Sequence, residues 1–299
     1  EAEALAKRFG IPNCSSSYKD ILNNSAVDAV LICSPTNTHA QYIVESAKAG
    51  KHIFCEKPID LDLATIQNAL KIVDEHGVKL MLGFNRRFDS NFRKIKEMVV
   101  AGKIGEPHIL KVTSRDPAPP PAEYVAVSGG MFLDMTIHDF DMARYIVGSE
   151  VEEVFVTAGV MVDPKIGEAG DVDTAVITLK FANGAMGVID NSRKAVYGYD
   201  QRVEIFGSKG MIKVDNNAPD NHEYYSENGV HASLPLNFFM DRYIEAYANE
   251  IKEFCAAVLE NKEISVGGED GLLAVAIGLA AKKSLAEKRP VKVSEVFSK

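Results

Sequence analysis

Two spacings of hydrophobic residues alternate along the first hundred positions. Apolar runs of strand length occupy residues 27–34 (VDAVLICS), 52–56 (HIFCE) and 79–84 (KLMLGF). Apolar residues at helical spacing occupy residues 1–9, 40–49, 63–76 and 90–102. The first strand is nearly continuous in its apolar character, which predicts a central strand covered on both faces. The alternation of strands and helices predicts βαβ units and a parallel sheet.

Glycines and hydroxyl residues mark the ends of these helices. Gly50 and Gly77 are placed to end the second and third helix. Thr36, Asn37 and Thr38 precede the second helix, and each of them can serve as its N-cap.

After residue 106 the spacing of apolar residues changes to two. Four strand-like segments follow, at 108–116, 151–162, 173–192 and 201–216, and the third contains Asn183-Gly184 between apolar runs, a hairpin signal. Two helices, 241–261 and 269–288, close the chain. We therefore expect an α/β domain over 1–106 and an α+β domain with an open, mainly antiparallel sheet over 107–299. The C-terminal helices can pack back on the first domain.

Length and charge limit the partners of this protein. Its 299 residues suit two domains, and 46% hydrophobic with 25% charged residues is a globular composition. The formal charge of −9 leaves no broad basic surface, which argues against nucleic acid and favours a small molecule. No segment reaches the roughly 18 apolar residues of a membrane span, and the N-terminus is no signal peptide. We expect a cytoplasmic protein without a membrane partner.

The four cysteines, Cys14, Cys33, Cys55 and Cys255, are widely spaced and form no C-x-x-C pair. This pattern predicts neither a disulfide framework nor a metal site.

A dinucleotide-binding domain normally opens with a strand, a G-x-G-x-x-G turn and a helix, followed by an acidic residue about 20 positions later. The chain starts on a helix and contains neither feature. Either the sequence lacks roughly 40 upstream residues, the length of a βαβ opening, or the fold does without that unit. We expect the former. The residue that separates NAD from NADP would lie in that segment.

The segment GGMFLDMTIHDFDMARYIVG (129–148) has the pattern of one amphipathic helix whose buried face is interrupted by polar groups. Asp134 and His138 are four residues apart, so that their side chains would share one volume. Histidine is the side chain whose pKa suits removal of a hydroxyl proton, and a neighbouring carboxylate can hold substrate hydroxyls or stabilise the imidazolium. A buried histidine bonded to a carboxylate is the alternative. Asp141 is better explained as a partner of a backbone or arginine group.

Five motifs occur together in a specific order: ICSPTNTH (32–39), CEKP (55–58), GFNRRFD (83–89), GEPH (105–108) and GGMFLDMTIHDFD (129–141). In this combination the chain resembles the glucose-fructose oxidoreductase and inositol dehydrogenase (Gfo/Idh/MocA) family over nearly its whole length. The resemblance implies a Rossmann domain, here without its N-terminal part, NAD as cofactor with NADP not excluded, and a cis peptide between Lys57 and Pro58. YGYDQRVEIFGSKG (197–210) is similar to the inositol dehydrogenase branch.

The resemblance and the residues together predict three groups of site residues. The catalytic group is Lys57, Asp134 and His138, with Lys57 at a strand end where an ammonium can lower the pKa of a substrate hydroxyl. The cofactor group is Ser34, Pro35, Thr36, Asn37, His39, Glu56, Lys57, Asn85 and Arg86; surface salt bridges are the alternative for Arg86 and Arg87. The substrate group is Lys57, Asp116, Asp134, His138, Tyr197 and Tyr199.

We expect NAD-dependent oxidation of a cyclic polyol, with myo-inositol converted to 2-keto-myo-inositol (scyllo-inosose) as the first choice. Ser114, Arg115 and Asp116 stand where inositol dehydrogenases commonly have a histidine and an asparagine, which puts the polyol in doubt. The alternatives are another inositol isomer, a pyranose sugar, or a sensor without catalysis. An open sheet face needs cover, so we expect a homo-oligomer, in the form of a tetramer.

Overall fold

The computed structural model describes residues 2–297, which divide into two compact units. The first unit holds the chain up to Gly83 together with Phe254–Glu269, and the second holds Phe84–Glu253 and the chain from Asp270 on. This division falls before the boundary expected near residue 106. Residues 254–269 of the C-terminal region belong to the first unit, where the ring of Phe254 lies 5.9 Å from that of Phe54.

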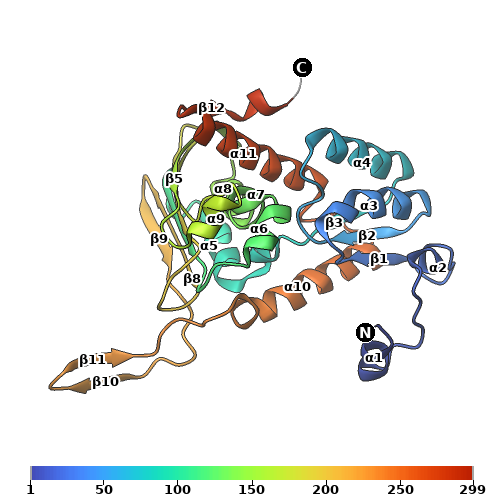
Figure 1. Cartoon of the computed structure of the whole chain (residues 1–299), viewed down its shortest axis with the longest axis horizontal. Helices are drawn as coiled ribbons and strands as arrows, with labels where there is room; N and C mark the ends of the chain where they lie inside the picture. The colour runs from blue at the N-terminus through green and yellow to red at the C-terminus, as the bar shows by residue number, and fades with distance from the viewer. Residues whose placement is uncertain (1, 298–299) are drawn as a thin grey trace. The chain divides into compact units, whose positions relative to one another are not determined.

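The first unit is built on a three-stranded parallel sheet. Its strands are β1 (Ala29–Ile32), β2 (His52–Cys55) and β3 (Leu80–Leu82), in the order β1-β2-β3. Its helices are α1 (Ala2–Phe9), α2 (Tyr18–Leu22), α3 (His39–Lys48) and α4 (Leu63–His76) (Figure 1). Asp62 caps α4 by accepting the Thr65 N–H, and Gly77 ends it at a φ of 63°. The predicted βαβ units and parallel sheet are confirmed.

The central position expected for the first strand is not seen among the described strands. There β1 pairs with β2 alone, and β2 lies between β1 and β3. Leu31 of β1 is 52% exposed. Apolar content showed that the strand favours burial on both faces, but it did not show which strands lie beside it.

The second unit contains a seven-stranded sheet in the order β12-β5-β6-β7-β4-β8-β9. The strands are β4 (Pro107–Arg115), β5 (Val151–Gly159), β6 (Thr174–Phe181), β7 (Met186–Ser192), β8 (Asp200–Gly207), β9 (Gly210–Val214) and β12 (Val291–Lys292). All neighbours are antiparallel except β4 and β7, which are parallel. Asn183-Gly184 forms the turn between β6 and β7. The prediction of a mainly antiparallel sheet is confirmed.

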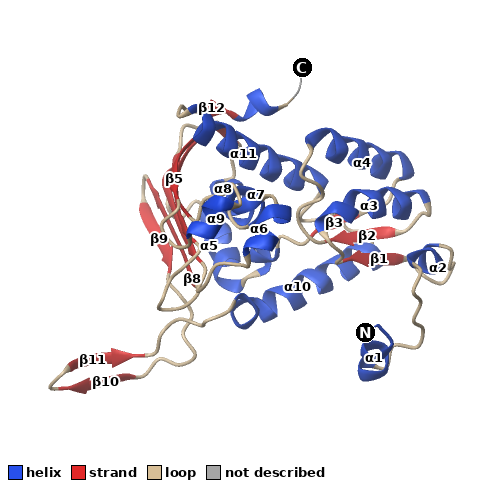
Figure 2. Ribbon diagram, in the orientation of Figure 1, coloured by secondary structure: helices blue, strands red, loops and turns tan. Residues whose placement is uncertain are grey.

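Helices cover one face of this sheet (Figure 2). The helices of the second unit are α5 (Ser90–Val100), α6 (Ala122–Ser128), α7 (Gly130–Asp134), α8 (Ile137–Val147), α9 (Pro164–Glu168), most of α10 (Phe239–Leu259) and α11 (Gly268–Glu287). Leu110, Val112 and Ser114 of β4 are buried. On β6 and β7 every second residue points away from the helices, and among these Val176 and Met186 are exposed. The sheet therefore has one covered and one open face.

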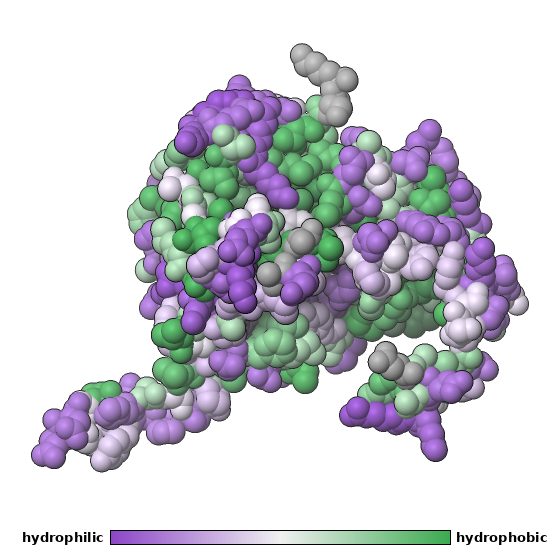
Figure 3. Space-filling model, viewed as in Figure 1, coloured by the Kyte–Doolittle hydropathy of each residue, from purple (hydrophilic) through white to green (hydrophobic). Residues whose placement is uncertain are grey.

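A separate hairpin, β10 (Glu223–Ser226) and β11 (Gly229–Ala232), pairs with no other described strand. The segment that follows it exposes apolar side chains, among them Leu234 and Phe238. Figure 3 shows a green, apolar surface at the base of the hairpin. Within residues 2–297, no helix combines the length and apolar character needed to cross a membrane.

Candidate active site

The carboxyl ends of the parallel strands carry the first group of predicted site residues. In a parallel sheet these ends share one edge, where ligands bind in open α/β folds. The loop after β1 contains Ser34 to Asn37 and includes a 3₁₀ turn at Thr36–Thr38. Thr38 takes the N-cap position of α3 but makes no side-chain cap bond, since its hydroxyl donates to the Pro35 carbonyl at 2.7 Å. Its oxygen also lies 2.6 Å from the Ser34 hydroxyl, which fixes the loop internally.

His39 joins this loop to the one that follows β2. Its ring is buried, with Nε2 2.7 Å from the Ser34 carbonyl oxygen and Nδ1 2.7 Å from that of Pro58. The Lys57-Pro58 peptide is cis, as the resemblance implied. Both ring nitrogens are thus engaged with protein carbonyls, and the ring holds the two loops together. The predicted cofactor contact of His39 stays a prediction.

Glu56 and Lys57 follow β2 directly and are half-buried. Burial raises the pKa of Glu56, and the neighbouring Lys57 ammonium opposes this shift. Gly83, just after β3, leaves room for Glu56, because a Cβ there would stand 2.8 Å from Oε2 of the carboxylate. The close approach explains why a residue without a side chain occupies this position.

The donors at this edge suit a dinucleotide. Pro35 and Asn37 are exposed, while Ser34, Thr36 and Lys57 are half-buried. Hydroxyl, amide, carboxylate and ammonium groups match the ribose hydroxyls and phosphates of such a cofactor. The residues present in the first unit therefore fit NAD.

The segment 129–148 of the second unit is two helices, so the prediction of a single helix is wrong. Helix α7 ends at Asp134 and α8 begins at Ile137. At the break, the Thr136 N–H donates to the Met131 carbonyl and the His138 N–H to that of Met135. The Thr136 hydroxyl donates to Asn191 of β7 at 2.7 Å, which ties the break to the sheet. Asp134 and His138 consequently belong to different helices.

Asp134 belongs to a charged cluster with Asp116 that the sequence did not reveal. Arg193, which follows β7, donates from Nη1 to Asp116 at 3.4 Å and from Nη2 to Asp134 at 3.3 Å. The Tyr124 hydroxyl donates to the other oxygen of Asp134 at 3.0 Å. Burial raises the pKa of Asp116, while Arg193 and Arg86 lower it. The structure thus brings together two of the predicted substrate residues around an unpredicted arginine.

His138 lies in the same unit, half-buried on the first turn of α8. The ring of Phe84 stands 6.1 Å from its imidazole, at an interplanar angle of 89°. An edge-to-face contact of this kind fixes the ring orientation while leaving it partly accessible.

Arg86 and Arg87 form buried ion pairs, so the alternative of surface salt bridges is wrong for both. They lie in the 3₁₀ turn Asn85–Phe88, whose residues are all buried. Arg86 donates to Asp139 at 2.5 Å, and the other oxygen of that carboxylate accepts from Asn191 at 2.9 Å. Burial raises the pKa of Asp139, and Arg86 opposes the shift. The cofactor contacts predicted for Asn85 and Arg86 stay predictions.

Asp141 is the arginine partner that the sequence suggested. Its carboxylate accepts from Arg87 at 2.5 and 2.9 Å, and Arg87 also donates to Asp270 at 2.8 Å. Its exclusion from the catalytic group stays a prediction.

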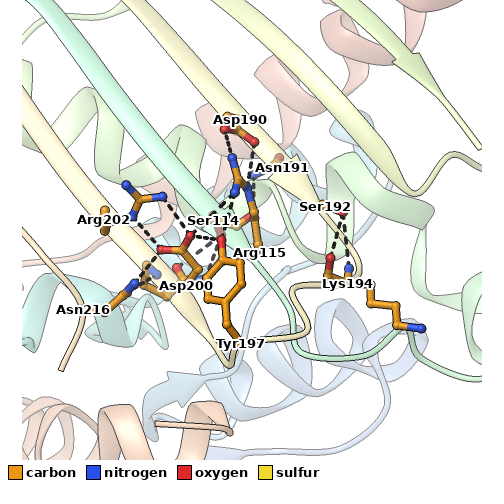
Figure 4. A network of polar contacts seen from close by, with 11 residues as sticks. Ser114, Arg115, Asp190, Asn191, Ser192, Lys194, Tyr197, Asp200, Arg202 and Asn216 are labelled. Atoms are coloured by element: carbon orange, nitrogen blue, oxygen red, sulfur yellow. Dashed lines mark hydrogen bonds and ion pairs between the residues drawn. The ribbon is translucent and has the colours of Figure 1, made fainter. Parts of the chain in front are cut away.

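The two tyrosines of the YGYD turn have different surroundings. Tyr197 donates to Asp200 at 2.6 Å and accepts from Arg115 at 2.9 Å, within the polar network shown in Figure 4. Tyr199 is buried, and its hydroxyl lies 3.5 Å from Nη2 of Arg86. Burial raises its pKa well above the usual value. No hydrogen bond between described residues joins the two hydroxyls, and their shared role as substrate contacts stays a prediction.

No sequence motif singled out Tyr124, Asp139, Asn191 and Arg193 as site residues. The sequence carried a signal in two places. Asp139 and Asp141 lie two residues apart on a helix and could pair with the consecutive arginines Arg86 and Arg87. Asn191-Ser192-Arg193 puts an amide and a cation at the end of a strand. Neither pattern identifies its partners, because these come from segments 50 or more positions away.

Comparisons with known proteins agree with this architecture. Residues 1–84 match the oxidoreductase family with NAD-binding Rossmann fold, and residues 92–213 match the GFO/IDH/MocA C-terminal domain. The chain is 53% identical to myo-inositol 2-dehydrogenase of Thermotoga maritima over 293 residues, 98% of this chain and 88% of that protein. The chain is 48% identical to inositol 2-dehydrogenase of Rhizobium meliloti over 294 residues, which are 98% of this chain and 88% of that protein.

A solved structure extends the likeness to a complex with ligands. Scyllo-inositol dehydrogenase from Lactobacillus casei, with bound cofactor NAD(H) and scyllo-inositol, has a TM-score of 0.90 and 31% identity. The match covers 98% of this chain and 88% of that one. The matched domains and these full-length relatives show that the chain belongs to the GFO/IDH/MocA family of oxidoreductases.

Proposed function

We propose that this protein is an NAD-dependent dehydrogenase that oxidises myo-inositol to 2-keto-myo-inositol (scyllo-inosose). The observation that carries the proposal is the 53% identity to a myo-inositol 2-dehydrogenase over 98% of the chain, a span that includes both the E-K-P and the D-M-T-I-H motifs. The polar groups around Ser34 and Glu56, at the edge of the first unit, support the binding of a dinucleotide there.

The proposed roles follow from the chemistry of each side chain. His138 takes the hydroxyl proton, because imidazole is a base near neutral pH. Lys57 stabilises the developing alkoxide charge, and Asp134 accepts hydrogen bonds from substrate hydroxyls. The bound cofactor supplies the hydride acceptor. Ser34, Pro35, Thr36, Asn37, His39 and Glu56 hold the cofactor.

A second candidate substrate is scyllo-inositol, because the similar Lactobacillus casei structure holds it. A sensor without catalysis is disfavoured, because Lys57, Asp134 and His138 are all present and a sensor needs no proton acceptor.

Initial rates of NAD and NADP reduction by the purified full chain test the proposal, with myo-inositol, scyllo-inositol, chiro-inositol, glucose and xylose as substrates. Turnover is expected with myo-inositol, and His138→Ala is expected to lower kcat at least about a hundredfold, the usual contribution of a general base. His76→Ala, an exposed histidine on α4, is the matched control. No turnover with any polyol would contradict the proposal.

We also propose a homotetramer in which the open sheet face is covered by another copy. Phe155, Val176, Met186 and Phe206 are exposed on this face, and apolar side chains on an antiparallel sheet favour sheet-to-sheet packing. No disulfide joins the four cysteines in the described part of the chain, which supports a cytoplasmic location because disulfides are rare in reducing compartments.

A further inference from the structure

We propose that Arg193 is a positioning residue that holds Asp116 and Asp134 in place as a pair of hydrogen-bond acceptors for two hydroxyls of a neutral polyol. This inference rests on the proposed function. It assigns a role to Arg193, which lies outside both the E-K-P and the D-M-T-I-H motif. All four residues that form the cluster, Asp116, Tyr124, Asp134 and Arg193, lie in the second unit.

The parallel pairing of β4 and β7 places Asp116 and Arg193 at the same sheet edge. Arg115 lies opposite Ser192 in the register, so the residues that follow the two strands are neighbours. The Asp116 N–H donates to the Ser192 carbonyl at 2.9 Å, and the Arg193 N–H to that of Asp173 at 2.8 Å. Backbone hydrogen bonds therefore hold the main chain of both residues at this edge of the sheet.

Asp134, the last residue of α7, comes from a different element and contacts the second terminal nitrogen of Arg193. The bond from Thr136 to Asn191 fastens the helix break to β7, two residues before Arg193. The Arg193 side chain is 4% exposed, whereas the carboxylates of Asp116 and Asp134 are 24% and 14% exposed. The arginine is thus enclosed, and the two acids that it joins keep an accessible side.

The charges explain why an arginine is needed between the acids. Two neighbouring carboxylates repel each other, and one of them would take up a proton as it becomes buried. Asp134 raises the pKa of Asp116, as does burial, while Arg193 and Arg86 lower it. Two tyrosines are further ionisable neighbours: burial raises the pKa of both Tyr124 and Tyr199, so both are neutral. Arg193 donates to both acids at once, and its charge opposes the rise in the pKa of Asp116.

Ionised carboxylates accept hydrogen bonds and donate none. Their ligand must therefore present donors, which the hydroxyls of a polyol do. The cluster of two acids and one arginine has a net charge of −1, so it disfavours anionic polyols such as uronic acids or phosphorylated sugars.

The test compares Arg193→Gln, Arg193→Lys and the double variant Arg193→Gln/Asp116→Asn in the full chain. Arg193→Gln is expected to raise KM for inositol by about tenfold or more, because contacts to charged groups contribute at least that factor, with KM for NAD unchanged. It is also expected to raise the pKa of Asp116, since this acid loses its cation. Arg193→Lys keeps the charge and should keep the pKa of Asp116 near that of the wild type. The double variant removes the repulsion between the two acids and should have a lower KM for inositol than Arg193→Gln.

Arg93→Gln is the matched control, since Arg93 is a half-exposed arginine paired with Glu253. An Asp116 pKa that does not rise in Arg193→Gln, or one that rises equally in Arg193→Lys, would overturn the proposal. A structural role alone predicts equal changes in both KM values and no recovery in the double variant.

A readout without turnover separates this inference from the proposed function. The pKa of Asp116 is followed by NMR of carbon-13-labelled aspartate, with Asp116→Asn for assignment. A higher pKa in Arg193→Gln than in the wild type supports the role of Arg193 even where no polyol is oxidised, and an unchanged pKa contradicts it. Absence of turnover in the wild type refutes the proposed function instead.

Discussion

Arg86 carries a permanent charge with only 6% of its side chain exposed, and it faces an Asp139 carboxylate that is fully buried. Taking both charges out of water is costly, and the pair is compensated by further bonds from Asn191 to Asp139 and by the nearby Ser114 and Tyr199 hydroxyls. At the scale of single residues, such pairs make the second unit sensitive to the loss of one partner. The remaining charge would have no compensation.

Arg86→Ala is expected to lower the free energy of unfolding by about 3–5 kcal/mol, the usual result of breaking a buried ion pair. Urea unfolding followed by circular dichroism measures the change. Arg93→Ala, which breaks the partly exposed pair with Glu253, should cost at most about 1 kcal/mol. If both variants lost the same free energy of unfolding, burial of the Arg86 pair would not explain its contribution to stability.

At the scale of elements, the connection between β5 and β6 is organised by a single carboxylate. Asp173 accepts backbone N–H bonds from Met161, Val162 and Asp163 at 2.8, 2.8 and 3.0 Å. Burial acts to raise the pKa of Asp173, but these bonds together outweigh it, so that the pKa is lowered. A lowered folded-state pKa contributes stability above the unfolded-state pKa of about 3.9 and loses it as the pH falls through the folded-state value.

Asp173→Asn should therefore lower the free energy of unfolding by about 1–3 kcal/mol at neutral pH. The difference from the wild type should shrink as the pH falls below about 4. Urea unfolding at several pH values tests this, with Asp215→Asn, an exposed aspartate paired with Lys213, as control. A difference that is constant across pH would mean that the ionised carboxylate is not the cause.

The ends of β2 and β3 are coupled through Gly83. A methyl group there would stand 2.8 Å from Glu56, so Gly83→Ala should displace that carboxylate. If Glu56 contacts the cofactor as proposed, KM for NAD should rise several-fold, at a cost of roughly 1 kcal/mol of binding. Gly210→Ala is the control, because open space surrounds that glycine. An unchanged KM for NAD in Gly83→Ala would remove Glu56 from the cofactor group.

At the scale of the whole molecule, the proposed tetramer places the open sheet face between copies. Val176→Lys places a charge among the exposed apolar residues of this face and should shift the oligomer toward smaller species, because a buried unpaired charge is unfavourable. Size-exclusion chromatography with light scattering measures the mass. Val100→Lys, an exposed valine on α5, should leave the mass unchanged. A wild-type monomer at micromolar concentration would contradict the proposed tetramer.

Local patterns predicted most of the elements. Helix α4 follows the predicted range 63–76 residue for residue, because its capping aspartate and terminal glycine act within the helix itself. The hairpin of β6 and β7 was equally predictable, since Asn183-Gly184 meets the requirement for a left-handed turn. The break at Met135 and Thr136 was not predictable, since the bond that holds it reaches Asn191 on a distant strand.

The residues of the candidate site likewise differ in whether the local sequence identifies them. Lys57, Asp134 and His138 could be selected from the sequence because they lie in short motifs whose chemistry is recognisable. Arg193 could not, because its place after Asn191 and Ser192 at a strand end does not identify the acids that it contacts. Only the distances to Asp116 and Asp134, from positions 77 and 59 residues away, give it a function.

The sequence by itself determined the order and type of the elements, the parallel and antiparallel character of the two sheets, and the family, because all of these follow from periodicity and short motifs. The tertiary structure alone decided that β2 lies between β1 and β3, that Arg86 and Arg87 are buried, and that one arginine joins two acids. The physical reason is that burial and electrostatic pairing depend on which distant segments meet in space, and this information is not local to any stretch of the chain.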